Sequence, residues 1–344
     1  MSYTFIVTVA NGKNSRAKDN PNTDYIPFAF NDVEAILDAQ KNEQITDYWK
    51  QSIRALIVKG KETEIVDTMV SDIYSYYRDV FALDDENTSN SEIKVRLFLN
   101  QPTGGEHGDA CKTEVRIFLK SIVTELRKKY GNIKIQEALI AVRAIYGDDT
   151  EWFLDYFRYV LAHELFHAFH YNHYFKVRGN NIYYGIRKQG VDPETGRDII
   201  LPDANCVLLE VLAEYFACAY MHRYLDSQDV AKTVSKWNTL RESPGKKYFG
   251  FLQEEIIKKF NDGIIPENLV LSVPKVWEEK GKPDPENNYL SLLDYAGGCL
   301  MYDKALEFGK QGRDYPGYKE VYNMILDGNS DEALYKVITL RANQ

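Results

Sequence analysis

Four histidines and a glutamate lie close together in LAHELFHAFHYNHYF, residues 161–175. His163 and His167 are four residues apart, so on a helix both project from one side, about 40° apart and one turn along the axis. Two imidazoles at this spacing can bind one zinc ion, and Glu164 lies about 100° round the helix, within reach of a metal-bound water. A carboxylate that takes a proton from such a water completes a hydrolytic nucleophile.

The residues around these histidines favour a metal over an ordinary buried pair. Residues 160–169 read VLAHELFHAF, with an apolar side chain at every position except the motif itself. A helix that is apolar all round is buried, and burying two histidines and a carboxylate is costly without a metal or other partners. A helix whose histidines are satisfied by neighbouring protein groups is the alternative interpretation.

A zinc site needs a third protein ligand, and a second stretch offers one. In CVLLEVLAEYFACAYM, residues 206–221, the only charged residues are Glu210 and Glu214, four apart on an apolar helical stripe. A buried carboxylate pair needs a cation or strong donors. Glu210 as zinc ligand, with Glu214 accepting the other ring N–H of a ligand histidine, would satisfy both. Pairing of the two glutamates with arginines is the alternative.

His173 is a competing third ligand, because it follows His167 at the spacing of the metzincin pattern. That pattern needs a glycine midway for the chain to turn back, and this sequence has His170 there. We therefore expect the helix to continue and to carry His173 about 120° away from His167, out of reach of the same ion. His170 is expected on the same side of the helix as His163. It could line the cleft or contact substrate, or equally be a packed histidine with a backbone partner. His107 and His222 are expected to be structural or solvated.

The stretches AHELFHAFH and LEVLAEYFA together resemble the gluzincin metallopeptidases, in particular forms seen in little-studied bacterial members. In that family the third zinc ligand is a glutamate on a helix downstream of the His-Glu-x-x-His helix. The resemblance covers roughly residues 113–225 and implies one zinc per chain. It also implies a role for each motif residue: zinc ligands His163, His167 and Glu210, general base and later proton donor Glu164, and supporting carboxylate Glu214.

Two further correspondences follow from the same resemblance. TEVRIFL, residues 113–119, precedes the histidine helix where the family has an edge strand, against which an extended peptide can lie. LLDYAGGCLMYDKAL, residues 292–306, resembles a Tyr-x-x-Gly helix, with Tyr295 and Gly298 at the matching positions. Tyr295 would donate a hydrogen bond to the developing oxyanion, and a packing role for it is equally open. The absence of a Gly-x-Met-Glu-Asn stretch argues against an aminopeptidase.

Hydrophobic periodicity predicts the elements that position these residues. The predicted elements of the first half are a strand over Thr4–Val9, helices over Asp32–Val58 and Glu62–Leu83, and strands with one solvated face over 92–99 and 113–119. From Ile135 onward the pattern is helical, interrupted by a hairpin around the turn DPETG within 176–205. That hairpin is a candidate lid or specificity loop.

A strand-rich beginning followed by helices predicts an α+β architecture. The resemblance implies a zincin-like metallopeptidase fold, with a mixed N-terminal lobe, a mainly helical C-terminal lobe and an active-site cleft between them. The expected regions are a mixed α/β region over 1–112, the catalytic core over 113–225 with the insertion 176–205, and the helical lobe over 226–344.

Composition limits the partners. The chain has 344 residues, 44% hydrophobic and 27% charged, as in ordinary globular proteins. Its net charge of −9 opposes binding to nucleic acid or to an acidic membrane surface. We see no signal-peptide pattern and no apolar segment of membrane-spanning length. Four scattered cysteines fit a reducing, cytoplasmic setting.

The sequence therefore predicts a zinc-dependent hydrolase, and the family resemblance makes peptides or proteins the expected substrates. The alternatives are a non-catalytic zinc-binding protein of the same fold, and a zinc hydrolase of non-peptide amides or esters. A closed structural zinc site has four protein ligands and needs no base beside the first histidine, which favours catalysis. The oligomeric state stays open.

Overall fold

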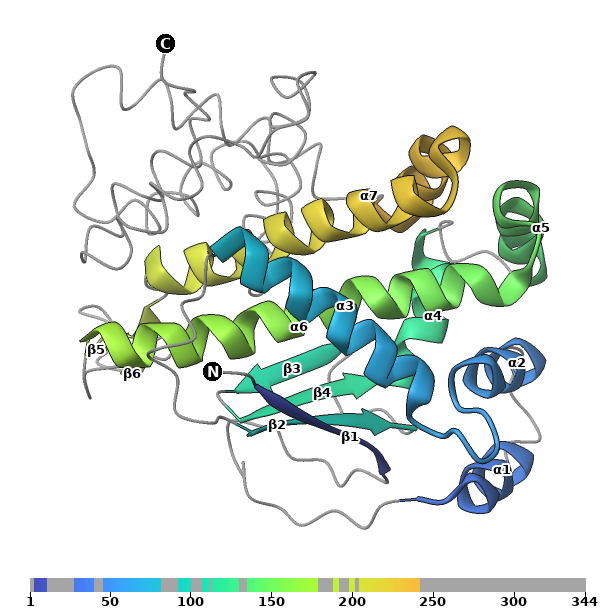
Figure 1. The fold of residues 1–344 in the computed structure, drawn as a ribbon, viewed down its shortest axis with the longest axis horizontal. Coiled ribbons are helices and arrows are strands. Elements are labelled where there is room, and N and C mark those ends of the chain that lie inside the picture. Colours follow the sequence, from blue (N-terminus) through green and yellow to red (C-terminus); the bar gives the residue numbers. More distant parts are fainter. Residues whose placement is uncertain are drawn as a thin grey trace. The chain divides into compact units, whose positions relative to one another are not determined.

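The computed structural model describes ten segments of the chain: residues 3–10, 28–39, 46–81, 92–99, 107–111, 113–129, 135–178, 188–191, 198–201 and 204–241. Over these segments the protein is a mixed α+β fold, as the sequence predicts (Figure 1). The chain forms two compact units, a first of Met1–His173 with Ala219–Glu242 and a second of Tyr174–Cys218 with Ser243–Gln344. The three-region division expected from the sequence stays a prediction.

The first unit contains a four-stranded sheet in the order β1-β2-β4-β3 (Figure 1). The strands β1, β2 and β4 are parallel, and β3 runs antiparallel along one edge. The strand predicted over Thr4–Val9 is confirmed within one residue. The strand bounds are β1 Thr4–Ala10, β2 Glu92–Phe98, β3 Gly108–Cys111 and β4 Glu114–Phe118.

Helices make up most of the remaining described chain. The predicted helix over Glu62–Leu83 is confirmed as α3, whereas the one predicted over Asp32–Val58 is found as two helices, α1 and α2. The helical pattern from Ile135 onward is confirmed by α5 and α6. The helix bounds are α1 Phe30–Ala39, α2 Thr46–Leu56, α3 Glu64–Phe81, α4 Leu119–Lys129, α5 Ile135–Tyr146, α6 Asp149–Arg178 and α7 Ala204–Arg241.

Helices α3 and α6 lie across one face of the sheet (Figure 1). Phe5 of β1 packs its ring against Tyr74 of α3 and Phe169 of α6, with centroids 5.4 Å and 6.2 Å apart. Tyr77 of α3 donates its hydroxyl to the carbonyl oxygen of Ala162 in α6, at 2.9 Å. These contacts hold the part of α6 that contains the histidine motif against the sheet.

The strands predicted over 92–99 and 113–119 are present; the expected solvated face is found at the start of β2, where Glu92 is exposed, but is wrong for β4. All five residues of β4 are buried, and Glu114 and Arg116 are each 1% exposed. Glu114 forms ion pairs with two arginines, Arg96 of the neighbouring strand and Arg116, the latter with an N–O distance of 3.2 Å. Buried charges need partners of this kind. The charges of β4, together with Arg96 of β2, therefore lie on a paired interior face.

The hairpin predicted around DPETG is confirmed by β5 (Lys188–Val191) and β6 (Asp198–Leu201), which pair antiparallel in the second unit. The segment between the two strands lies outside the described residues. None of the helices in the described part of the chain is long and apolar enough to cross a membrane.

Candidate metal centre

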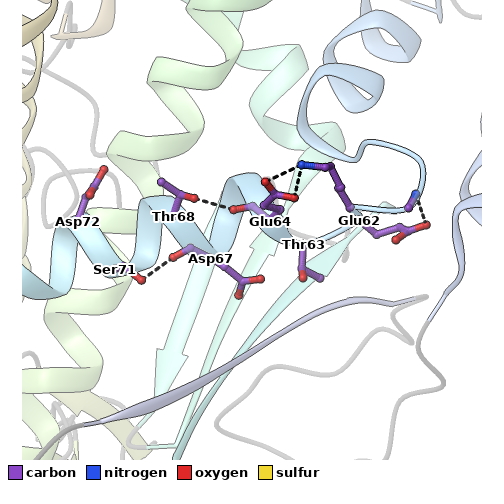
Figure 2. A pocket seen from close by; sticks show the side chains of 9 residues that line it. Glu62, Thr63, Glu64, Asp67, Thr68, Ser71 and Asp72 are labelled. Carbon is purple, nitrogen blue, oxygen red and sulfur yellow. Dashed lines mark hydrogen bonds and ion pairs between the residues drawn. The ribbon is translucent and has the colours of Figure 1, made fainter.

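A surface depression lies along the first turns of α3, and its polar groups are engaged with one another (Figure 2). Glu62 accepts a hydrogen bond from a nearby backbone N–H, and Lys61 forms an ion pair with Glu64 at 2.8 Å. Thr68 and Ser71 donate their hydroxyls to carbonyls of their own helix, four residues back. No histidine or cysteine is among the described residues that line it. These contacts stabilise the start of α3 and offer no converging set of ligands.

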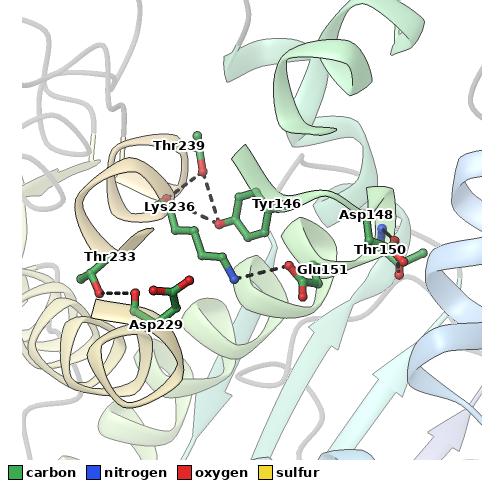
Figure 3. Close-up of polar contacts among 8 residues, drawn as sticks. All are labelled: Tyr146, Asp148, Thr150, Glu151, Asp229, Thr233, Lys236 and Thr239. Atoms are coloured by element: carbon green, nitrogen blue, oxygen red, sulfur yellow. Dashed lines mark hydrogen bonds and ion pairs between the residues drawn. The ribbon is translucent and has the colours of Figure 1, made fainter. Parts of the chain in front are cut away.

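The histidine motif lies on one unbroken helix. Its start is fixed by Asp148, whose carboxylate accepts hydrogen bonds from the backbone N–H and the hydroxyl of Thr150, at 2.6 Å and 2.8 Å (Figure 3). From there α6 runs for 30 residues to Arg178 without a glycine or a proline. The continuation predicted from the missing glycine is confirmed, so His173 lies six helical residues beyond His167. A metzincin-type turn back to the metal is therefore absent from α6.

His163 and His167 face each other in the interior. Their Nε2 atoms are 3.1 Å apart, and their ring planes are inclined at 76°. The two residues are 6% and 5% exposed. Two nitrogens that each lie about 2.05 Å from a tetrahedral zinc ion are about 3.3 Å apart, so the pair fits a shared metal. A hydrogen bond from one imidazole to the other would give a similar distance, because one ring can donate and the other accept.

Glu164 is also buried, at 8% exposure, and lies against the edge strand β3. An added Cβ at Gly108 of β3 would lie 2.8 Å from Glu164 Cγ and 3.0 Å from its Oε1. The strand at this edge is thus β3. The expectation that residues 113–119 form the edge strand is wrong, because β4 lies between β2 and β3. Sequence inspection overlooked β3 because its four residues, GDAC, show no hydrophobic alternation.

The third ligand stays a prediction. Glu210 and Glu214 both lie in α7, as the apolar stripe predicts, and Glu214 is 5% exposed. The side chains of Glu210, His170 and His173 lie outside the described residues, as do Tyr295 and Gly298 in their entirety. Within the described part of the chain, no three His, Cys, Asp or Glu side chains come together as a metal-binding group.

The two remaining histidines make local polar contacts. The Nδ1 atom of His107 hydrogen-bonds the hydroxyl of Ser121, and its Nε2 lies 3.2 Å from a carboxylate oxygen of Glu125. The Nδ1 atom of His222 lies 3.6 Å from a carboxylate oxygen of Asp226, one turn along α7. These contacts agree with the structural role expected for both residues.

Sequence inspection missed a buried charge on α6, five residues before the motif. Arg158 is 7% exposed and donates to the hydroxyl of Tyr220 at 2.7 Å and to Asp72 at 3.3 Å. Its guanidinium lies 4.0 Å from the centre of the Tyr224 ring, a cation–π contact. Arg158 thereby links α6 to α3 and to the part of α7 that belongs to the first unit. The available signal was a lone arginine inside the apolar run FRYVLA.

Asp155, one turn earlier on α6, is a second buried titratable group. It is 7% exposed, and burial raises the pKa of its carboxyl from 3.8 to about 6 against the opposing effect of Lys236 and Arg158. Lys236 of α7 also lies 3.4 Å from a carboxylate oxygen of Glu151 and 4.8 Å from the ring centre of Tyr146 (Figure 3). Lys236 therefore connects the last turns of α7 to α5 and α6 through polar contacts.

No family model, curated protein or solved structure matches the chain. Two facing imidazoles can hold a divalent metal, and the adjacent buried carboxylate can move a proton.

Proposed function

We propose that this protein is a zinc-dependent hydrolase with a zincin-like fold, acting on peptides or proteins. The observation that carries the proposal is the 3.1 Å separation of the His163 and His167 Nε2 atoms inside a buried helix. Glu210 of α7 is the proposed third ligand, and Glu214 is the proposed acceptor for the second ring N–H of a ligand histidine. The burial of Glu214 supports an inward-facing carboxylate at this position of α7.

A bound zinc ion would supply a polarised water and a Lewis acid for the substrate carbonyl. In this proposal Glu164 moves the protons: its carboxylate takes one from the attacking water and later gives it to the leaving amine. The closeness of Glu164 to β3 supports a peptide substrate, because an edge strand can bind an extended chain as an added strand, and β3 is an edge strand of the described sheet. Tyr295 is the proposed hydrogen-bond donor to the oxyanion.

The ligand set is tested by elemental analysis of three purified proteins at matched concentration: the wild type, Glu210→Gln and His173→Ala. We expect about one zinc per chain in the wild type and in His173→Ala, and strong loss in Glu210→Gln. Zinc retained in Glu210→Gln and lost in His173→Ala would exclude Glu210 as the ligand. A wild type that takes up no zinc after supplementation would exclude the proposed function at its first step.

Catalysis is tested with Glu164→Gln, which keeps the shape of the side chain but cannot accept the proton. We expect it to bind zinc as the wild type does and to hydrolyse a peptide library at least about 100-fold more slowly. The matched control is Glu137→Gln on the exposed face of α5, which should change neither property. If the wild type cleaves small amides or esters but no peptide, the proposal of zinc-dependent hydrolysis would stand and that of a peptide substrate would be excluded.

A further inference from the structure

Strand β3 passes unusually close to Glu164. A Cβ at Gly108 would meet Glu164 Cγ at 2.8 Å, closer than side-chain carbons approach one another, and would lie 2.9 Å from the carbonyl oxygen of Arg116. Only glycine lets the strand backbone lie directly against the glutamate. Backbone atoms of β3 consequently contact one side of the Glu164 side chain and prevent it from rotating towards the sheet.

The beginning of this strand is held in place by His107, the residue before Gly108. His107 contacts α4 through both ring nitrogens: Nδ1 hydrogen-bonds the hydroxyl of Ser121, and Nε2 lies 3.2 Å from a carboxylate oxygen of Glu125. Its carbonyl accepts the backbone N–H of Phe118 in β4, at 2.9 Å. We call His107, Ser121 and Glu125 the His107 anchor. Because ring and backbone are both bonded, the strand cannot easily retreat from α6.

The same anchor contacts the motif helix directly. The His107 ring packs edge-on against Tyr156, with centroids 5.7 Å apart and planes at 82°. Tyr156 precedes His163 by seven residues, so it lies on the same side of α6, two turns away. The anchor thus touches α6 on the histidine side, and Gly108 touches it at Glu164. A nucleophilic serine role for the anchor is not supported, because Ser121 is 1% exposed.

We propose that Gly108 and the His107 anchor are positioning residues that fix the Glu164 carboxylate for proton transfer. The inference rests on the proposed function for its catalytic meaning, but its geometry does not need the metal. A carboxylate with free rotation would reach the reacting proton only part of the time, whereas one held by a stiff strand is already in place. An alanine at position 108 would meet both the Arg116 carbonyl and Glu164, so the part of its effect that depends on Glu164 reports displacement of the carboxylate.

The geometry is tested on metal-free protein with Gly108→Ala, Glu164→Ala and the double variant, each unfolded in urea. We expect Gly108→Ala to lower the unfolding midpoint in the wild-type background and to lower it clearly less in the Glu164→Ala background, which keeps the close approach to the Arg116 carbonyl but lacks the glutamate atoms that clash. Equal lowering in both backgrounds would overturn the proposal. If Gly108→Ala alone does not fold, recovery of folding in the double variant supports the proposal, and failure of both overturns it.

The positioning role is tested on protein loaded with Co²⁺. We expect Gly108→Ala to retain one cobalt per chain, to change the visible absorption as Glu164→Gln does, and to lose at least tenfold in kcat with an unchanged KM for a peptide that the wild type cleaves. His107→Ala should act in the same direction, and Cys111→Ala on the same strand should leave spectrum and kcat unchanged. Wild-type values in Gly108→Ala overturn the positioning role. If the effect of Gly108→Ala depends on Glu164 in metal-free protein but the wild type takes up no metal, the contact stands and the proposed function is overturned.

Discussion

Helix α6 buries polar side chains along its length, and two of these places, around Arg158 and at the histidine pair, are stabilised in different ways. In its first half, Arg158 is surrounded by complementary groups from other helices, with Tyr220 and Asp72 as hydrogen-bond acceptors. Near its middle, the side chains of His163 and His167 face each other, with their Nε2 atoms 3.1 Å apart. Complementary partners offset the cost of burying a charge, whereas the facing imidazoles are the pair that we propose to share a metal ion.

The largest expected effect is on zinc binding, and it comes from changing one of the two facing histidines. We expect His167→Asn to weaken zinc binding at least about 1000-fold, which corresponds to about 4 kcal/mol, while the free energy of unfolding of metal-free protein changes by less than about 1 kcal/mol. Competition with a chromophoric chelator and urea unfolding measure the two quantities. His222→Asn is the matched control and should retain zinc. Full zinc affinity together with a large loss of stability would show that the pair is structural.

The next effect concerns Asp155 and depends on pH. The folded chain keeps a proton on this carboxyl up to pH of about 6, because burial raises its pKa, whereas the unfolded chain releases it near 3.8. The folded state therefore binds more protons in that interval, and its stability falls as pH rises through it. Asp155→Asn should remove this pH-dependent loss of stability, because asparagine does not titrate.

We expect Asp155→Asn to be more stable than the wild type by up to about 3 kcal/mol at pH 7.5 and equal to it near pH 4. Urea unfolding at several pH values measures the difference. The charged groups that bear on Asp155 are Lys236, Arg158 and Glu151, and they are unchanged in the variant. A stability difference that does not vary with pH would contradict the raised pKa.

Arg158→Met is expected to have a smaller effect on stability and none on the metal. It leaves the Tyr220 hydroxyl buried without its donor and removes the cation–π contact with Tyr224, while the half-exposed Asp72 can regain water. We expect a loss of about 2 kcal/mol in the free energy of unfolding and unchanged zinc content in the folded protein. Arg78→Met, at an exposed position of α3, is the control. Zinc loss in Arg158→Met would contradict the distinction between a stabilising role for Arg158 and a metal-binding role for the histidine pair.

The smallest expected effect comes from Tyr77→Phe. The change removes one hydrogen bond, from the Tyr77 hydroxyl to the carbonyl of Ala162, immediately before the first motif histidine. We expect a loss of about 1 kcal/mol in thermal or urea unfolding, with zinc binding unaffected. A drop in zinc affinity would instead show that this bond controls where His163 lies.

Local patterns were sufficient to predict the histidine helix. The run around His163 and His167 is apolar on all sides, and no glycine interrupts it at His170, so continuation of α6 past His173 follows from the sequence alone, although α6 ends at Arg178, inside the segment predicted as an insertion. The hairpin of β5 and β6 was equally predictable, because DPETG contains the residues that tight turns need. Both features are decided by neighbours in the chain.

The features that sequence inspection misjudged depend on distant partners. The charges of Glu114 and Arg116 resemble a solvated strand face until the strand pairing brings Arg96 beside Glu114. Gly108 has no signal of its own, because its importance arises from Glu164, which reaches it only through the fold. Arg158 is similar, since its partners come from α3 and α7. A period of two shows alternation but not what covers each face.

The parallel pairing of β1 with β2 sets the order in which the chain can fold. Thr4 is paired with Glu92, so all of α1, α2 and α3 lies in the loop that must close before these two strands meet. Closing long loops costs entropy before any contact repays it, and sheets of this kind form slowly. Helix formation in α6 is local and fast by comparison. After dilution from denaturant, the amides of α6 should therefore be protected from hydrogen exchange before those of β1, and Glu164 should reach its final surroundings only when the sheet is complete.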